Sequence, residues 1–156
     1  MAVKAIPEGY HSVTPYLIVD GAAQAIDFYK RAFNATELMR MEGPRGKIAH
    51  AEIRIGDSPV MLADEQPEMG HRGPQAAGGA PVSLVVYLED VDKIFRQALD
   101  NGAQELQPVK NQFYGARSGT LKDPFGHVWM IATQIEDVPP EEMERRMQEY
   151  RKGAGG

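Results

Sequence analysis

Two residues that can do acid–base chemistry, His50 and Glu52, stand two positions apart in an alternating stretch from Lys47 to Ile55. This alternation predicts a β-strand, on which residues two apart point to the same face. A histidine beside a carboxylate on one face can transfer protons or supply two ligands to a metal ion. The same pattern, continued by Arg54, also fits a solvated strand face with ion pairs. We therefore expect His50 and Glu52 either to be catalytic or to belong to such a face.

A second candidate segment, 113–119, joins two aromatic side chains to an arginine between glycines. In it, Tyr114 can cover a ligand ring while Arg117 binds a carboxylate or phosphate. The alternative is a hairpin whose aromatic residues close the core. His127 follows an Asp-Pro-Phe-Gly turn, and we interpret it as a structural residue at the end of that turn. Trp129, the only tryptophan, is expected either in the core or as a stacking wall of a pocket.

The composition restricts the classes of function. Hydrophobic residues make up 42% and charged residues 25% of the 156 residues, as in ordinary soluble globular domains. The net charge of −5 argues against a general nucleic-acid binder, which would carry a basic face. The absence of cysteine excludes disulfides, thiolate metal sites and cysteine nucleophiles. No apolar run is long enough to span a bilayer and no secretory signal is evident, so we expect a cytoplasmic protein without nucleic-acid or membrane partners.

The elements that must position these residues follow from the hydrophobic periodicity. Apolar residues at helical spacing predict a helix over 22–33, with Asp20 placed to cap its N-terminus. The surrounding module, 12–65, then has the order β-α-β-β-β, with strands over 13–19, 37–42, 47–55 and 60–63. The same order recurs in the module 82–136, with a helix over 91–99 and strands over 82–88, 103–109, 117–121 and 128–135.

An internal repeat connects the two halves. The segment 35–38 (ATEL) matches 103–106 (AQEL) at an offset of 68, and Met61 and Met130 are separated by 69. One unit alone would leave a sheet face bare, so two should pack side by side around a shared concavity. The fold class predicted for this single domain is α+β, with two tandem βαβββ modules forming a cupped mixed sheet. The remaining parts are a linker loop over 66–81 and, over 137–156, a C-terminal helix to Tyr150 with a flexible tail from Gly153 to Gly156.

Three motifs resemble the vicinal oxygen chelate superfamily of glyoxalases, bleomycin-resistance proteins and extradiol dioxygenases, and in particular its PhnB-like branch. They are PYLIVD at 15–20 with AIDFY at 25–29, HAEIRIG at 50–56, and DPFGH at 123–127. The resemblance covers about residues 12–137 and implies paired βαβββ modules with a cupped sheet, often in a homodimer. Ala116 and Gln134 depart from the Asp and His that PhnB-like relatives carry at those positions, which weakens an inherited catalytic role for that segment.

In metal-dependent members of that superfamily, each module supplies one ligand from its first strand and one from its last. The corresponding positions here are Thr14 and Met61 in the first module, and Ser83 and Met130 in the second. None is a histidine or a carboxylate, and hydroxyl and thioether groups are poor ligands for divalent metals. We therefore expect no resident cofactor, with a divalent metal at a site shifted to His50 and Glu52 as the alternative.

The resemblance and the missing ligands favour a protein that binds a small aromatic or drug-like molecule, as bleomycin-resistance members do. One alternative is an enzyme, either a metal-dependent lyase, isomerase or oxygenase or a metal-free acid–base catalyst. Another is an interaction protein whose cup is filled by its own side chains or by a partner. A homodimer is expected in each case. The expected contact residues are Thr14, Tyr16, Met61, Ser83, Val85, Tyr114, Trp129 and Met130, with His50, Glu52 and Arg117 as polar anchors.

Overall fold

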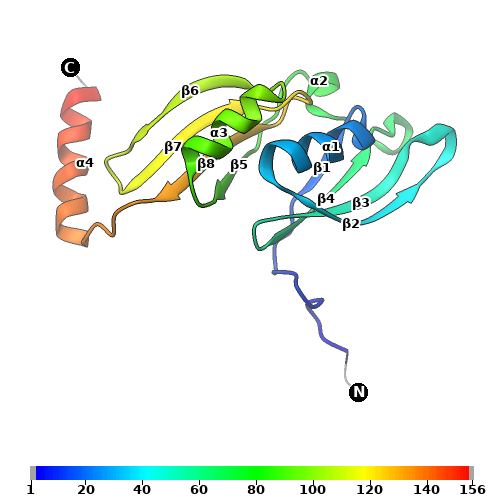
Figure 1. Ribbon diagram of the computed structural model, residues 1–156, viewed down its shortest axis with the longest axis horizontal. Coiled ribbons are helices and arrows are strands. Elements are labelled where there is room, and N and C mark those ends of the chain that lie inside the picture. Colours follow the sequence, from blue (N-terminus) through cyan, green and yellow to red (C-terminus); the bar gives the residue numbers. More distant parts are fainter. Residues whose placement is uncertain (1–2, 155–156) are drawn as a thin grey trace.

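The computed structural model describes residues 3–154, as two βαβββ modules followed by a C-terminal helix (Figure 1). The first module consists of β1 (Tyr16–Val19), α1 (Ala22–Phe33), β2 (Thr36–Glu42), β3 (Ile48–Ile55) and β4 (Ser58–Asp64). The second consists of β5 (Ser83–Tyr87), α3 (Val91–Asp100), β6 (Gln104–Asn111), β7 (Ala116–Lys122) and β8 (Val128–Gln134). A short α2 (Pro74–Ala77) lies between the modules, and α4 (Pro140–Ala154) is the last element. The predicted α+β class is confirmed.

Each module forms its own four-stranded mixed sheet, in the orders β1-β4-β3-β2 and β5-β8-β7-β6. The first and last strands of a module are parallel neighbours, and the other pairs are antiparallel. The register defines the repeat, since Tyr16 pairs with Met61 and Val85 pairs with Met130. Both members of one pair lie 69 residues from their counterparts in the other, which confirms the predicted offset between Met61 and Met130.

The helices α1 and α3 each receive a hydrogen bond at their start from a side chain of the last strand of their own module, and α3 is also capped locally by Asp90, which accepts from the Lys93 N–H at 3.2 Å. Asp64 Oδ1 accepts a hydrogen bond from the backbone N–H of Ala22 at 2.8 Å. Thr133 Oγ1 accepts one from the backbone N–H of Val91 at 3.0 Å. Both donors are among the N–H groups that a helix leaves free at its start. The capping role predicted for Asp20 was therefore wrong, because the cap comes from a strand that is distant in sequence.

Strand β3 does not alternate strictly at its beginning. The pairing with β2 skips Ala49, so that a β-bulge turns Ile48 into the core, where it is 1% exposed. The alternation predicted from Lys47 to Ile55 would place Ala49 on the buried face of Ala51, but this was wrong at the start of the strand, where Ala49 is only half-buried. His50 and Glu52 follow the bulge and keep the predicted arrangement on the face opposite Ala51.

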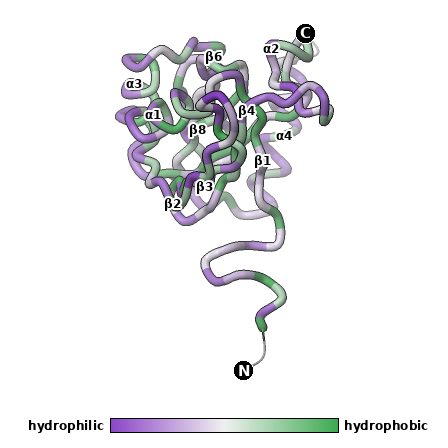
Figure 2. Tube along the Cα trace, turned by 90° about the vertical axis from the view of Figure 1, so that its right-hand side faces the viewer, coloured by the Kyte–Doolittle hydropathy of each residue, from purple (hydrophilic) through white to green (hydrophobic). Residues whose placement is uncertain are grey.

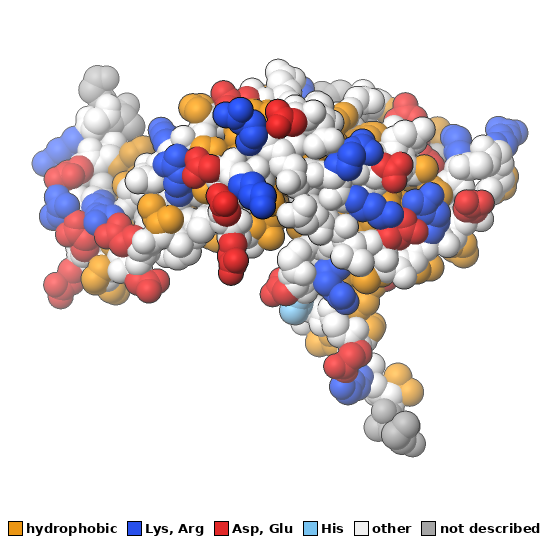
Figure 3. Space-filling model, in the orientation of Figure 1, with side chains coloured by type: hydrophobic (Ala, Val, Ile, Leu, Met, Phe, Trp, Pro, Cys, Tyr) orange, Lys and Arg blue, Asp and Glu red, His pale blue; other side chains and the backbone are white. Residues whose placement is uncertain are grey.

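The core lies between each sheet and its own helix, and α1 packs against α3 across the two modules (Figure 1). Alternate strand residues such as Leu17, Val19 and Ile131 are buried beneath the helices. The hydropathy trace in Figure 2 accordingly has its hydrophobic segments within the strands of the body and polar segments around them. Figure 3 shows charged side chains of both signs over the helix-bearing face. The opposite face of each sheet is open, with Tyr16 45% and Val85 53% exposed.

A buried carboxylate ties the modules together at the turn before β8. Asp123 is 3% exposed, and its Oδ2 accepts hydrogen bonds from the Tyr29 hydroxyl on α1 at 2.6 Å and from Trp129 Nε1 at 2.9 Å. Its Oδ1 accepts from the backbone N–H groups of Phe125 and His127, at 2.9 and 3.0 Å. The Asp-Pro-Phe-Gly-His segment therefore shapes its own turn and bonds the second module to the helix of the first.

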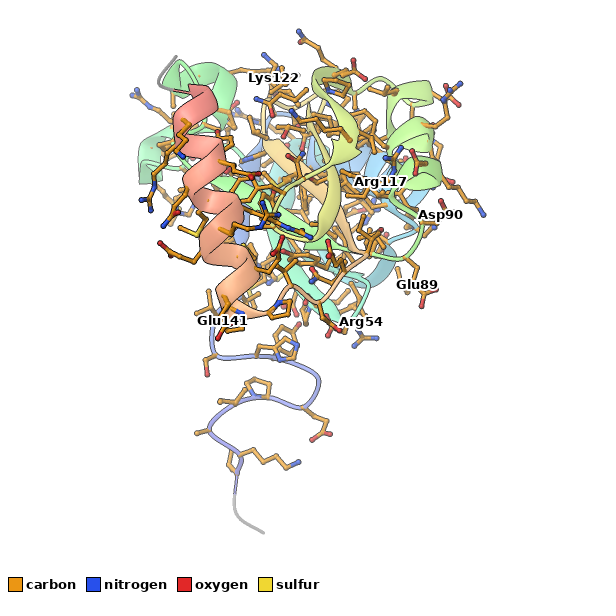
Figure 4. The ribbon with its side chains drawn as sticks, turned by 90° about the vertical axis from the view of Figure 1, so that its left-hand side faces the viewer. Arg54, Glu89, Asp90, Arg117, Lys122 and Glu141 are labelled. Atoms are coloured by element: carbon orange, nitrogen blue, oxygen red, sulfur yellow. The ribbon has the colours of Figure 1, made fainter. Side chains whose placement is uncertain are left out.

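Helix α4 stands at the outer edge of the second module (Figures 1 and 4). Phe113 stacks on Tyr150 with ring centroids 4.9 Å apart, and Arg146 donates to the carbonyl oxygen of Phe113 at 3.0 Å. The helix continues to Ala154, past Tyr150, where we expected it to end. The last two residues of the predicted flexible tail lie outside the described residues. None of the helices within residues 3–154 combines the length and the apolar character needed to cross a membrane.

Candidate functional site

The open face of the first sheet carries three polar side chains joined by hydrogen bonds, which we call the Tyr-His-Glu chain. Tyr16 on β1 and Glu52 on β3 lie on either side of Met61 in the register, so they point to the same face. The Tyr16 hydroxyl lies 3.0 Å from His50 Nδ1, and His50 Nε2 lies 2.8 Å from Glu52 Oε2. The side chains of His50 and Glu52 are 22% and 18% exposed, so they are partly shielded from water but still reachable.

The donors and acceptors of this chain follow from the carboxylate. An ionised Glu52 can only accept, so His50 Nε2 carries a proton, and in a neutral imidazole Nδ1 is then the acceptor. The Tyr16 hydroxyl donates to it and keeps its oxygen lone pairs for a ligand donor.

Methionine side chains surround the Tyr-His-Glu chain. Met61 lies between Tyr16 and Glu52, Met39 pairs with Glu52 on β2, and Met41 follows two residues further along the same face. Met39 is 40% and Met41 52% exposed. Unbranched thioether side chains adapt to ligands of different shapes and make favourable contacts with aromatic rings. A surface of exposed apolar groups around a polar centre is typical of a binding site.

The equivalent face of the second sheet is less polar. Ser83, Val85 and Tyr87 alternate on β5 with exposed side chains, and Met130 on β8 and Thr120 on β7 continue the row. The predicted contact residues Ser83, Val85 and Met130 therefore share one face. The structure places them on the second sheet, and the Tyr-His-Glu chain on the first.

Arg117 and Trp129 lie on the opposite, helix-bearing face of the second sheet. Arg117 donates two hydrogen bonds to Asp92 of α3, at 2.8 and 2.9 Å, and lies on the side where α3 begins (Figure 4). These hydrogen bonds lower the pKa of Asp92. Trp129 is 1% exposed and its indole N–H is bonded to Asp123. Arg117 thus bonds to α3 and Trp129 is a core residue, so neither lies beside the Tyr-His-Glu chain, and their role as ligand contacts stays a prediction.

Tyr114 and Thr14 lie beyond the strand ends. Tyr114 is in the turn between the edge strand β6 and its neighbour β7, with its ring edge-on to Phe113 at a centroid distance of 5.3 Å. Thr14 precedes β1 and is half-buried. The structure therefore groups Tyr16, Met61, His50 and Glu52 from the predicted set, and leaves Tyr114 in the outer turn.

Two features of this face went unnoticed in the sequence. Met39 and Met41 stand two apart in β2, which was the available signal for a shared face, but register alone shows that the face is that of His50. Tyr16 was expected as a contact residue and not among the polar anchors, whereas its hydroxyl completes the hydrogen-bond chain. No local pattern reveals that contact, because Tyr16 and His50 are 34 residues apart.

The donor set at the superfamily's usual metal positions does not fit a divalent ion. Thr14 and Ser83 offer hydroxyls, and Met61 and Met130 offer thioethers, which are poor ligands for such ions. His50 and Glu52 are better metal ligands, but His50 Nε2 and Glu52 Oε2 are hydrogen-bonded to each other. Across residues 3–154, no three His, Asp or Glu side chains form a group that could hold a metal ion.

Two βαβββ modules, each with a helix on one face of a mixed sheet, define the class of this protein. The chain belongs to the Glyoxalase/Bleomycin resistance protein/Dioxygenase superfamily, whose family model matches residues 9–131. Protein Mb0911c of Mycobacterium bovis is 41% identical over 150 residues, which cover 94% of this chain and 96% of that protein.

Solved structures share the fold at lower identity. Protein PA1353 of Pseudomonas aeruginosa superposes with a TM-score of 0.66 and 23% identity, over 81% of this chain and 99% of that one. A PhnB protein of Bacillus cereus, described as a putative 3-demethylubiquinone-9 3-methyltransferase, superposes with a TM-score of 0.62 and 19% identity, over 79% and 99% of the two chains. Likeness at this level of identity shows that the fold is shared.

Proposed function

We propose that this protein binds a small, largely aromatic molecule on the open face of the first sheet, with the Tyr-His-Glu chain as its polar anchor. The observation that carries the proposal is the combination of exposed Tyr16, Met39 and Met41 with a hydrogen-bonded His50 and Glu52 at their centre. An apolar surface with a few convergent polar groups is the usual design of a small-molecule site.

The energetics support a ligand with an apolar body and one polar group. Covering a single exposed Met or Tyr side chain with apolar surface contributes about 1.5–3 kcal/mol when burial is complete. A ligand hydroxyl or amide can donate to the Tyr16 oxygen, whose own proton is held by His50. Because His50 and Glu52 are hydrogen-bonded to each other, neither needs a ligand to supply its partner.

We also propose a homodimer in which the second copy walls the cup. In one chain both open faces expose apolar side chains, including Met41 at 52%, Val85 at 53% and Tyr87 at 61%. A second copy would cover such surface, and an isologous dimer does so with one pair of faces. Light scattering should give about twice the chain mass of 17.2 kDa. A mass of one chain across micromolar concentrations would remove the dimer.

The hydrogen-bond chain favours one second candidate, a metal-free acid–base enzyme. His50, oriented by Glu52, would accept the Tyr16 proton, and Tyr16 would exchange protons with a bound carbonyl compound. The test is deuterium exchange at the α-carbon of hydroxyacetone in D₂O, followed by NMR. Exchange by the parent protein that is lost in His50→Ala would establish this activity, and equal rates in both would exclude it.

The binding proposal is tested by titration with the fluorescent aromatic anion 1-anilinonaphthalene-8-sulfonate. We expect Met41→Glu to weaken binding about tenfold or more, because it removes apolar contact area and places a charge in the site. The matched control is Met69→Glu, which makes the same change at a methionine that is 66% exposed in the segment between the modules. His50→Ala should also weaken binding, since it frees the Tyr16 hydroxyl and Glu52 from their common partner.

Two results would contradict the proposal. Equal losses in Met41→Glu and Met69→Glu would mean that the dye binds wherever apolar surface is exposed. Unchanged affinity in both Met41→Glu and His50→Ala would place the dye elsewhere on the protein. Circular dichroism of each variant checks that the fold is retained.

A further inference from the structure

A cavity of about 290 Å³ lies between β1 and the segment that leads into β5. Most of its lining is apolar, with Pro15 and Leu17 on one side and Pro81, Val82 and Leu84 on the other. The volume is near the lower end of the range for small-molecule sites. Neither His50 nor Glu52 lines this cavity, so it is distinct from the open face described above, although Tyr16 borders both.

The roof of the cavity is held in place by close backbone packing. A Cβ at Gly73 would lie 3.0 Å from the Ile18 carbonyl oxygen, and one at Gly126 would lie 2.9 Å from Pro74 Cβ. The segment 66–81, predicted as a linker loop, does connect the modules, but its middle is wedged between β1 and the turn before β8. The wall is therefore formed before any ligand arrives, which reduces the ordering cost of binding.

The polar groups of the cavity are suited to an anion. Arg72 is exposed and makes no ion pair with any carboxylate in the described part of the chain, and no acidic side chain lines the cavity. His127 Nε2 lies 3.1 Å from the Ile18 carbonyl oxygen, which can only accept, so Nε2 carries the proton. His127 is thus fixed as a structural residue of the turn, and Arg72 supplies the positive charge.

The free edge of β1 adds a backbone donor. The carbonyl oxygen of Pro15 accepts from Met61 N–H in β4, and that of Val19 accepts from Glu65 N–H just after β4, so the groups of Leu17 between them also point to β4. Backbone groups alternate along a strand, which directs those of Ile18 to the other edge, where its carbonyl meets His127. The Ile18 N–H points the same way, toward the cavity.

From these observations we infer that the cavity is a second binding site, for small aromatic carboxylates. The aromatic ring lies between the proline and aliphatic walls, and the carboxylate accepts hydrogen bonds from the Arg72 guanidinium and the Ile18 N–H. A guanidinium and a carboxylate form the stronger, charge-assisted kind of hydrogen bond. This site is independent of the ligand proposed for the Tyr-His-Glu chain.

The test is isothermal titration calorimetry of the full chain with 2-naphthoate, and with the neutral isostere 2-naphthylmethanol. We expect 2-naphthoate to bind with a submillimolar dissociation constant and the alcohol to bind about tenfold more weakly. Arg72→Gln should weaken 2-naphthoate about tenfold, to the level of the alcohol. Ala77→Phe, which places a ring in the cavity from the exposed helix α2, should abolish binding of both compounds.

Two control variants locate the effect. Arg96→Gln removes an exposed arginine of α3 that does not line the cavity, and should leave the affinity within twofold of the parent. His50→Ala reports on the other site, because His50 belongs to the Tyr-His-Glu chain and does not line this cavity. Absence of binding at millimolar 2-naphthoate would overturn the inference, as would equal affinity in Arg72→Gln. Loss in His50→Ala with retention in Arg72→Gln would assign the compound to the open face instead.

Discussion

Replacing Asp123 by alanine removes a buried carboxylate that accepts hydrogen bonds from both modules. The Tyr29 hydroxyl and the Trp129 indole N–H, both fully buried, then lose their hydrogen-bond partner. Each buried donor left unsatisfied costs about 1–3 kcal/mol, so we expect the free energy of unfolding to fall by about 4 kcal/mol. For a chain of this size, that corresponds to a decrease in Tm of about 8–16 °C.

The assay is urea unfolding followed by circular dichroism and by Trp129 fluorescence, with Asp137→Ala as control. Asp137 is exposed and forms no hydrogen bond through its side chain in the described structure, so its loss should cost less than about 0.5 kcal/mol. Tyr29→Phe tests this explanation, because it removes the Tyr29 hydroxyl, one of the two side-chain donors that lose their acceptor in Asp123→Ala. We expect the double variant Tyr29→Phe/Asp123→Ala to be about 1–3 kcal/mol more stable than the sum of the single effects.

Two results would refute this reasoning. A decrease of less than about 1 kcal/mol in the free energy of unfolding of Asp123→Ala would mean that water replaces the carboxylate as hydrogen-bond acceptor without cost. Strict additivity in the double variant would mean that Tyr29 and Asp123 do not depend on each other.

Burial, followed by the Asp123 charge, raises the pKa of Tyr29 well above its ordinary value of 10.0, so the native state retains a proton that the unfolded state releases. Stability should therefore fall above pH 10 by about 1.4 kcal/mol per pH unit, and Tyr29→Phe should flatten this dependence in urea unfolding between pH 9 and 11; a parallel slope would contradict it. Asp64→Ala should cost about 2–4 kcal/mol, because it strands buried backbone donors at the start of α1 and β3, whereas Thr133→Ala should cost about 1–2 kcal/mol. Equal losses of unfolding free energy in Asp64→Ala and Thr133→Ala, measured by urea unfolding, would mean that the hydrogen bond from the Ile48 N–H to Asp64 adds no stability. Hydrogen bonds from Arg145 and then Arg146 lower the pKa of Glu142 to about 2, so its contribution to α4 is present above pH 4.5 and is lost as the pH falls to about 2. An NMR titration of the Glu142 carboxylate with a midpoint near 4.5 would show that the pairs do not form.

Most of the fold could be read from local pattern. The predicted helix over 22–33 coincides with α1, and each predicted strand overlaps the observed one, because helical and strand periodicity are properties of neighbouring residues. The side of β3 that carries His50 and Glu52 followed from the same alternation.

The errors share one cause, which is distance along the chain. Asp20 was the local candidate for a cap, but Asp64 reaches the helix from β4. Arg117 and Trp129 were expected in the cup because their residue types suit a ligand. The strand register instead places both on the helix-bearing face of the second sheet. A single bulge at Ala49 changed which residues enter the core.

The sequence by itself determined the two βαβββ modules, their repeat and the residue types available for chemistry. Only the tertiary structure decided that Tyr16 is hydrogen-bonded to His50, that Met39 and Met41 lie beside them, and that Arg72 lines a cavity. The reason is physical. Periodicity is set by neighbours along the chain, whereas a site is set by strand register and module packing, which bring together residues tens of positions apart.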